Sequence, residues 1–202
     1  SAHDHIVFVD SNVFTPPGYL DQLMAALHKD AGMVSAPPVG LAPIGFWAEL
    51  ECAFLNSYQA RMQYAIDTLG LGFAQGKNLM FRRADLEHGG FAQLASEPAE
   101  DAAATKMMKA RGRRIRLAGP FPQLIGPRGA MQVWKRHVRW ARLRRASFPL
   151  LFAPELLAGL VPPLAAFVAG LACLGLASPV LAAGFIAIWY VPELALLRAA
   201  GW

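Results

Sequence analysis

Residues 5–10, His5-Ile-Val-Phe-Val-Asp10, form a short unbroken run of β-branched and aromatic side chains that ends in an acid. Such a run is typical of a fully buried strand in a parallel sheet. A helix is predicted next, because Pro16 and Pro17 suit a helix start and apolar residues follow at helical spacing over residues 20–27. Residues 32–36 then predict a second strand. A strand, a helix and a strand in this order indicate an α/β fold.

Helices, strands and loops alternate as far as residue 145. A long amphipathic helix is expected over residues 46–69, because its apolar side chains recur along one stripe. The remaining predictions are a Pro/Gly loop at 37–43, strands at 74–83 and 114–118, a helical turn at 84–88, a helix at 99–111, a second Pro/Gly-rich loop, and a strongly basic helix at 130–145.

Charge and hydrophobicity are unevenly distributed along the 202 residues. The chain is 55% apolar and only 16% charged, whereas about 25% charged residues is usual in a soluble domain. Residues 106–145 hold 13 of the 19 Lys and Arg and no acid, and residues 148–197 carry only Glu155 and Glu193 as charges. A basic block followed directly by an apolar block indicates a membrane boundary.

Two apolar segments close the chain. Residues 156–176 provide about 21 uncharged positions, enough to cross a hydrocarbon core of about 30 Å. Residues 179–197 are a second candidate span, interrupted by Pro192, in which Trp189 and Tyr190 suit an interface. A buried helical hairpin in a soluble core is the alternative, but the segment length and the adjoining basic block favour a membrane. The positive-inside rule then puts residues 135–145 on the cytoplasmic side.

Two acidic motifs are candidates for chemistry. Asp10-Ser11-Asn12 follows the first predicted strand, and ligands bind at the carboxyl ends of strands in open α/β sheets. A carboxylate there can hold a divalent cation that neutralises a diphosphate, although an Asp after a strand is also a common turn former. Glu100-Asp101 opens a predicted helix, where acids complement the helix dipole or cap the helix. Asp101 is alternatively a general base that deprotonates an acceptor hydroxyl.

A third motif, Arg136-His-Val-Arg-Trp140, lies in the basic helix. Arginine suits bidentate contact with phosphates, and a Trp at a membrane edge can form one wall of an acceptor site. A cationic helix that faces lipid headgroups is the plainer interpretation. Nucleic-acid binding is a further option, since the pI is about 9.6 and Trp134 and Trp140 interleave with the charges. The adjoining apolar block argues against it, so no nucleic-acid partner is expected.

These motifs, in this order, resemble the processive and lipid-acceptor glycosyltransferases of family 2 and its relatives. The chain resembles in particular family 21, the ceramide glucosyltransferases, and within it the bacterial hopanoid-biosynthesis-associated glycosyltransferases. The resemblance spans essentially the whole chain. The stretches that carry it are Gly45-Phe-Trp-Ala-Glu-Leu-Glu51, Leu71-Gly-Phe-Ala-Gln-Gly-Lys77, Phe81-Arg-Arg-Ala-Asp-Leu86, Ala99-Glu-Asp101 and residues 136–140.

This resemblance implies a fold, an activity and a location. Residues 1–128 are expected to be the C-terminal part of a GT-A catalytic domain, 129–147 a basic interfacial helix, and 148–202 a membrane region of about two transmembrane helices. The implied activity is inverting transfer of a hexose or N-acetylhexosamine from a UDP-sugar to a hydroxyl of a hopanoid- or ceramide-type lipid. The implied location is the bacterial inner membrane, multi-pass, with the active site facing the cytoplasm. The alternative is a membrane-anchored, catalytically inactive binding protein.

The family's functional residues map onto this chain one by one. Asp101 matches the third catalytic aspartate and is expected to be the general base, and Asp10 matches the second and is expected to bind the donor. Arg136 and Arg139 are expected to bind the donor diphosphate, and Trp140 the acceptor.

The match is incomplete at two places. Asp10 and Asn12 are expected to ligate Mg²⁺ or Mn²⁺, but Asn12 stands where relatives with a D-x-D motif carry a second Asp, which weakens the metal assignment. The family's first aspartate and N-terminal anchor have no counterpart here. We therefore expect the chain to be a fragment of a longer protein and to be inactive alone.

Overall fold

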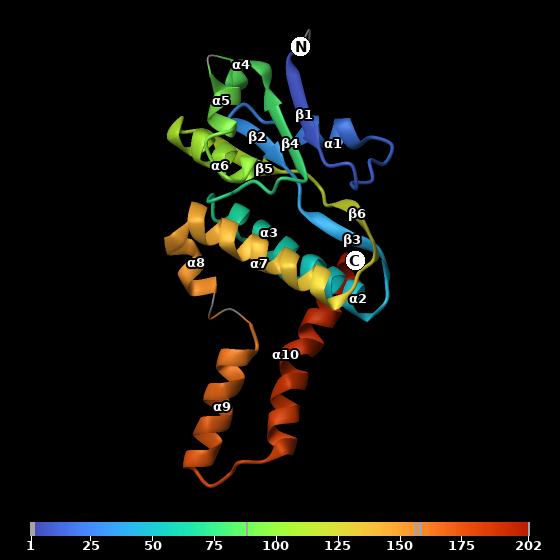
Figure 1. Cartoon of the computed structure of the whole chain (residues 1–202), viewed down its shortest axis with the longest axis vertical. Helices are drawn as coiled ribbons and strands as arrows, with labels where there is room; N and C mark the ends of the chain where they lie inside the picture. The colour runs from blue at the N-terminus through green and yellow to red at the C-terminus, as the bar shows by residue number, and fades with distance from the viewer. Residues whose placement is uncertain (1–2, 88, 156, 158, 202) are drawn as a thin grey trace. The chain divides into compact units, whose positions relative to one another are not determined.

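The computed structural model describes residues 3–87, 89–155, 157 and 159–201. The chain divides into two compact units, residues 1–139 and residues 140–202. The first unit holds all the strands of the described residues and the second is helical (Figure 1). The predicted α/β class is confirmed for the first unit.

A four-stranded sheet forms the centre of the first unit (Figure 1). Its strands stand in the order β1 (His5–Val9), β4 (Asn78–Arg82), β2 (Ala31–Ser35) and β5 (Arg114–Leu117). β4 runs antiparallel to both of its neighbours, whereas β2 and β5 are parallel. The residues that lead into β4 therefore lie at the same end of the sheet as those that follow β1 and β2.

β1 corrects the prediction of a fully buried parallel strand. Within the described part of the chain it pairs only with β4, in antiparallel register from His5 opposite Arg82 to Val9 opposite Asn78. It stands at the edge of the sheet, and Phe8 and Val9 are exposed. A short apolar run signals a strand, but its neighbours and their direction depend on distant segments.

Helices cover both faces of this sheet. The first face packs against α6 (Glu100–Ala110), and the second packs against α1 (Tyr19–Ala26). Successive strand residues point to opposite faces, so chain neighbours divide between the two cores. Phe81 lies in the core beside α6, whereas Met80 lies in the core beside α1. Both helices were predicted and both are confirmed.

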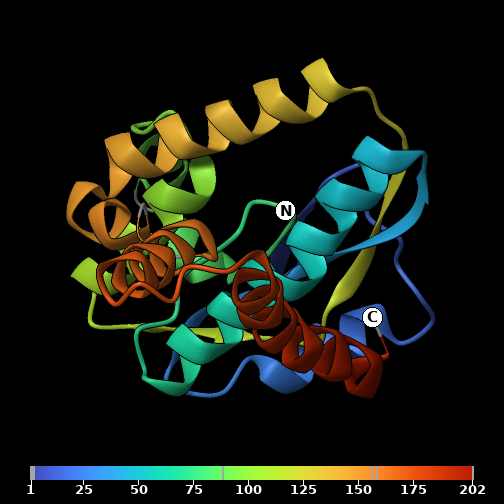
Figure 2. The ribbon, with the colours of Figure 1, turned by 90° about the horizontal axis from the view of Figure 1, so that it is seen from below.

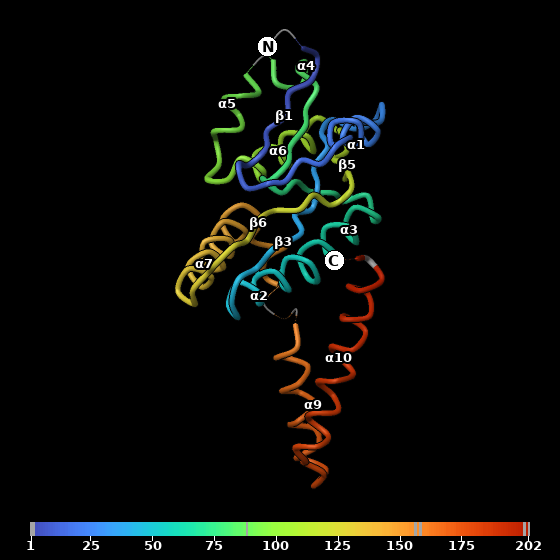
Figure 3. The backbone as a smooth tube through the Cα atoms, turned by 90° about the vertical axis from the view of Figure 1, so that its right-hand side faces the viewer, coloured from blue at the N-terminus to red at the C-terminus, as the bar shows by residue number. Residues whose placement is uncertain are grey.

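A two-stranded parallel ribbon lies next to the sheet (Figure 3). It consists of β3 (Pro38–Ile44) and β6 (Phe121–Pro127), which pair along most of their length. Both segments were predicted to be Pro/Gly loops, and that prediction is wrong. The ribbon is also bonded on its outer side, because Val13 forms a bridge with Gln123 of β6 and the Phe14 N–H donates to the Pro122 carbonyl (2.7 Å). A proline has no N–H to donate, but its carbonyl can still accept such a bond.

The predicted helix over residues 46–69 is confirmed in extent but not in regularity. It is one continuous helical run (Figure 2) made of α2 (Phe46–Ala53), a π-helical segment η1 (Phe54–Gln59) and α3 (Ala60–Thr68). Buried Asn56 of η1 accepts a hydrogen bond of 2.6 Å from the Gly40 N–H and donates one of 3.3 Å to the Gly40 carbonyl. Its amide thus bonds β3 as a neighbouring strand would. Gly40 allows this approach, because a Cβ there would lie 2.8 Å from Cys52 Sγ.

Three further helices follow β4 in the chain, two short and one long. α4 (Arg83–Leu86) fits the predicted helical turn, whereas α5 (Gly90–Leu94) was not predicted. α7 (Ala130–Ser147) is the predicted basic helix, and it runs across the boundary between the two units.

The second unit contains α8 (Pro149–Glu155), α9 (Val161–Cys173) and α10 (Pro179–Ala200). Within the described residues, one helix is long and apolar enough to cross a membrane, over Pro179–Ala199. The first predicted segment, 156–176, forms the 13-residue helix α9 instead, and its residues 156 and 158 lie outside the described part. At 1.5 Å per residue α9 is about 20 Å long, short of a 30 Å core. A second span therefore stays a prediction.

Candidate functional site

The centre of the site is a three-residue turn, Gln75-Gly76-Lys77, which leads into β4. A strand was predicted from residue 74, but pairing begins only at Asn78. The backbone N–H of Gln75 donates to Ser35 Oγ at the end of β2 (3.1 Å), and that hydroxyl donates back to the Gln75 carbonyl (3.3 Å). Gln59 of η1 donates to the Gln75 side chain (2.9 Å). The turn is thus anchored to the main sheet and to the long helical run.

Asp101 is fastened to the middle residue of this turn. The Gly76 N–H donates to Asp101 Oδ2 (2.9 Å), and the Ala102 N–H donates to Asp101 Oδ1 (2.8 Å). A Cβ at position 76 would lie 2.8 Å from Glu100 Oε1 but 3.5 Å, an ordinary contact distance, from Asp101 Oδ2, so the small residue makes room for Glu100 beside the turn. The sequence-based prediction of an acid pair at a helix start is confirmed, because Glu100 and Asp101 lie in the first turn of α6. Asp101 also joins this helix to the turn before β4 through its contact with Gly76.

The surroundings of Asp101 favour a proton acceptor. Burial raises the pKa of Asp101 above that of an ordinary aspartate. The hydrogen bond from Ala102 opposes this rise in pKa, the negative charge of Glu100 adds to it, and the hydrogen bond from Gly76 opposes it again. A carboxylate with a raised pKa is a stronger base than one free in water, which suits general base catalysis.

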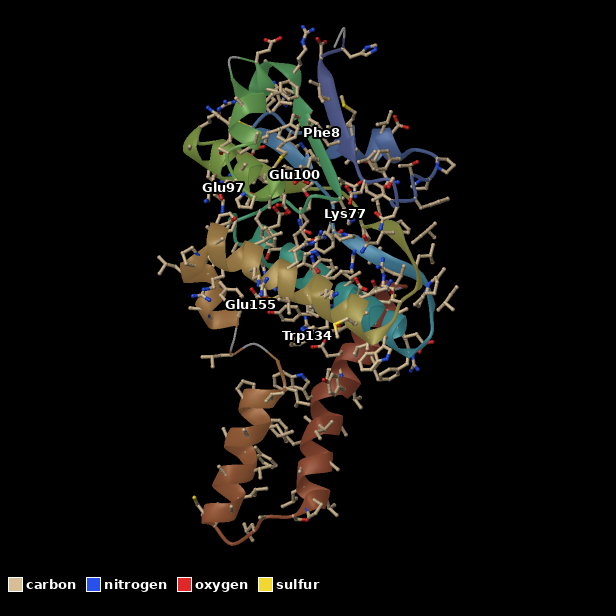
Figure 4. All side chains as sticks on the ribbon, viewed as in Figure 1. Phe8, Lys77, Glu97, Glu100, Trp134 and Glu155 are labelled. Carbon is tan, nitrogen blue, oxygen red and sulfur yellow. The ribbon has the colours of Figure 1, made fainter. Side chains whose placement is uncertain are left out.

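Lys77, the last residue of the turn, binds both members of the predicted metal site. Its ammonium is hydrogen-bonded to the Asp10 carboxylate and donates to Asn12 Oδ1 at 3.2 Å. The backbone adds a third link, because the Asp10 N–H donates to the Lys77 carbonyl (3.1 Å). Figure 4 shows Lys77 near the end of the main sheet, with Glu100 close by. Sequence reasoning missed Lys77, although it ends one of the stretches that carry the family resemblance.

These residues do not fit a divalent metal. The Asp10 and Asn12 oxygens both accept hydrogen bonds from an ammonium group, whose positive charge repels a second cation. Over the part of the chain that the structure describes, no three His, Cys, Asp or Glu residues gather in a way that could hold a metal ion. Mg²⁺ is usually bound through one or two carboxylates together with substrate phosphates and waters, and here the Asp10 carboxylate is already paired with Lys77.

Arg136 is committed to a buried acid. Glu51 on α2 is completely buried, and its two carboxylate oxygens lie 2.8 Å from Arg136 Nε and 3.1 Å from Arg128 Nε. The next residue of α7, His137, packs edge-on against Phe54 of η1, with ring centroids 4.7 Å apart. The first half of α7 is therefore fastened to the long helical run, and Arg136 has a structural role that the sequence did not reveal.

Arg139 and Trp140 differ from Arg136 in that neither binds Glu51. Arg139 is exposed at the end of the first unit, and Trp140 is half-buried at the start of the second. Among the described residues, no ion pair or hydrogen bond commits the Arg139 side chain to a buried partner.

Comparison with known protein families assigns the chain to one of them. The model of "Glycosyl transferase family 21" matches residues 1–202. The chain belongs to glycosyl transferase family 21. No curated protein matches it.

Family 21 membership makes this chain a glycosyltransferase, which moves a sugar from a donor to an acceptor. A transferase of this kind needs a base for the acceptor and positive charge for the donor's leaving group. In this family 21 chain, one turn binds the partly buried Asp101 carboxylate through the Gly76 N–H and carries the ammonium of Lys77.

The Glu51 cluster generates a prediction about stability. Glu51→Gln should lower the free energy of unfolding by about 3 kcal/mol, because two guanidinium groups then face a buried neutral amide. Thermal unfolding of the detergent-solubilised protein, followed by circular dichroism, measures this as a midpoint lower by about 6–12 °C.

Glu49→Gln is the matched control, since Glu49 lies on the same helix but is exposed. It should change stability by less than about 0.5 kcal/mol. Equal midpoints for both variants would show that Glu51 does not hold α7, and would return Arg136 to the phosphate-binding role.

Proposed function

We propose that this chain is the C-terminal part of an inverting GT-A glycosyltransferase that transfers a hexose or N-acetylhexosamine from a UDP-sugar to a hydroxyl of a hopanoid- or ceramide-type membrane lipid. The observation that carries the proposal is the partly buried Asp101 carboxylate, held by the turn that also presents the Lys77 ammonium. Family 21 membership supplies the reaction type.

In the proposed reaction, Asp101 accepts the proton of the lipid hydroxyl. The hydroxyl oxygen forms a bond to the anomeric carbon as the bond from that carbon to the donor's phosphate oxygen breaks. UDP leaves with the bonding electron pair, and attack from the opposite side inverts the anomeric centre. The raised pKa of Asp101 increases the driving force for proton transfer.

Arg139 is the proposed arginine contact for the donor diphosphate. It is exposed, whereas the guanidinium of Arg136 already binds Glu51. We therefore narrow the phosphate role within the R-x-x-R-W motif to Arg139, and we assign Trp140 to the acceptor.

Exposed apolar side chains support a lipid acceptor. Phe46, Trp47 and Leu50 of α2 are between 43% and 67% exposed, as are Met131 and Trp134 of α7. Figure 4 labels Trp134 on α7. Trp and other aromatic residues favour the interface between lipid and water. We propose that these residues contact the membrane from which the acceptor is drawn, and that residues 135–145 keep the catalytic unit on the cytoplasmic side of a bacterial inner membrane.

Asp101→Asn tests the general base. The variant should bind UDP almost as well as the wild type but turn over at least about 10²-fold more slowly, the usual scale for losing a general base. Steady-state transfer by the full-length protein in detergent micelles, with UDP binding measured by calorimetry, separates the two effects.

Glu100→Gln is its control: Glu100 is exposed and should be dispensable as a base, although loss of its charge should lower the pKa of Asp101. The wild-type rate should fall as pH decreases, with an apparent pKa above that of an ordinary aspartate, because the base must be ionised to act. A near-normal kcat for Asp101→Asn would mean that the base lies elsewhere, or that the protein only binds its ligands.

Arg139→Lys and Trp140→Ala test the R-x-x-R-W motif. If Arg139 binds a diphosphate, Lys should lower kcat/KM by about tenfold or more, since it lacks the planar fork. If the helix only attracts anionic lipid, Lys should serve nearly as well, because charge alone then counts. Trp140→Ala should raise the KM for the lipid more than the KM for the nucleotide sugar.

Arg142→Lys is the matched control, an exposed arginine three residues further along α7. Its kinetics should equal those of the wild type. Unchanged kinetics in Arg139→Lys and Trp140→Ala would leave a lipid-binding helix as the better account of the motif.

Membrane insertion is tested by alkaline carbonate. The full-length protein should stay in the membrane pellet, because α10 offers 21 consecutive residues of high hydropathy that are not buried in the structure. Release into the supernatant would instead favour packing of the apolar helices inside a soluble assembly. Labelling of a cysteine placed at exposed Arg145 should occur only from the cytoplasmic side.

A further inference from the structure

We infer that the Lys77 ammonium takes the place of a divalent metal as the counter-charge for the donor's diphosphate, so that transfer by this protein does not depend on a metal. This inference rests on the proposed function, and it concerns how the donor's leaving group is stabilised. It starts from the finding that Asp10 and Asn12, the predicted metal ligands, bind the Lys77 ammonium instead.

The first argument is geometric. Lys77 projects from the turn onto Asp10 and Asn12, and its side chain is 21% exposed, whereas that of Asp10 is 48% exposed. An ammonium has three N–H donors. Asp10 and Asn12 account for two of them, which leaves one for an oxygen of an incoming phosphate.

The second argument concerns why the ammonium is held there. An exposed ion pair contributes little to stability, so fold stability alone gives little reason for the contact between Lys77 and Asp10. The contact does orient a long, flexible side chain. Asp10 and Asn12 then act as positioning residues that fix the cation before the donor arrives, which reduces the reorganisation needed during the reaction.

The third argument is the link to the base. Lys77 directly follows Gly76, whose N–H binds Asp101, and the Lys77 carbonyl accepts the Asp10 N–H. Two consecutive residues of one turn therefore position both groups: Gly76 binds the proposed base, Asp101, and Lys77 carries the cation. When the bond between the anomeric carbon and the phosphate oxygen breaks, negative charge grows on the diphosphate, and a fixed lysine is a recognised point-charge partner for phosphate.

The test uses the full-length protein in detergent micelles, with wild type, Lys77→Met, Lys77→Arg and Lys106→Met. Lys106 is the matched control, because it also pairs with an acid, Glu97, at 2.6 Å. Sugar transfer is measured in EDTA and with added Mg²⁺ or Mn²⁺, and UDP binding is measured by calorimetry in EDTA. Thermal midpoints confirm that each variant is folded.

The wild type should keep its transfer rate and its UDP affinity in EDTA. Lys77→Met should lower kcat by about 10²-fold, the scale for one lost donor at a developing charge, and weaken UDP binding by about tenfold or more. Lys77→Arg should keep part of the UDP affinity, and Lys106→Met should match the wild type in both measurements.

Two results would overturn the inference. One is wild-type transfer that EDTA abolishes and Mn²⁺ or Mg²⁺ restores. The other is a folded Lys77→Met variant that binds UDP in EDTA as tightly as the wild type. Failure of the proposed function is distinguishable: if the wild type transfers no sugar under any condition, yet UDP binding in EDTA still depends on Lys77, transfer fails and the phosphate-binding role of Lys77 stands.

Discussion

The Gln75-Gly76-Lys77 turn is the constraint on which the candidate site depends. Three neighbouring peptide units bind Ser35 at the end of β2, Asp101 at the start of α6, and Asp10 after β1. This convergence exists because β4 runs against β1 and β2, which brings its entry to the sheet end where those two strands finish. Without that reversal, Asp101 and Lys77 would not share one turn. The chemistry we propose is therefore a consequence of strand direction.

The buried Glu51 carboxylate separates a structural role from a binding role among the arginines of α7. Glu51 holds Arg128 and Arg136, two arginines separated from it by 77 and 85 positions in the sequence, and a completely buried carboxylate needs such partners to be tolerated. The R-x-x-R-W motif then contains one arginine that positions the helix and one, Arg139, that is exposed. Residues of a single motif can thus serve folding and binding separately, because the Arg136 side chain reaches the buried Glu51 whereas that of Arg139 stays exposed.

Two parts of the chain expose apolar side chains, and they suit different contacts with a membrane. α10 is apolar along its length and exposed in the structure, as a membrane-crossing helix requires. The exposed aromatic residues at the start of α2 belong to the catalytic unit, where they suit contact with a surface better than a crossing. The apolar helix and the exposed aromatic residues both fit the proposed reaction, in which a water-soluble donor must meet an acceptor that stays in the bilayer.

The sequence by itself determined the elements whose signals are local. The sequence predicted the helices α1, α6 and α7, and with α6 the place of Asp101 at a helix start. The candidate membrane span, predicted at residues 179–197, follows from its hydropathy. Only the tertiary structure decided that β1 is an edge strand, that two proline-containing segments pair as a ribbon, and that Lys77 occupies the oxygens of Asp10 and Asn12. The physical reason is distance along the chain. Capping and periodicity act over a few residues, whereas the contact between Lys77 and Asp10 joins positions 67 apart, and the contact between Arg136 and Glu51 joins positions 85 apart. Such contacts depend on how the whole sheet closes, and no local pattern encodes that.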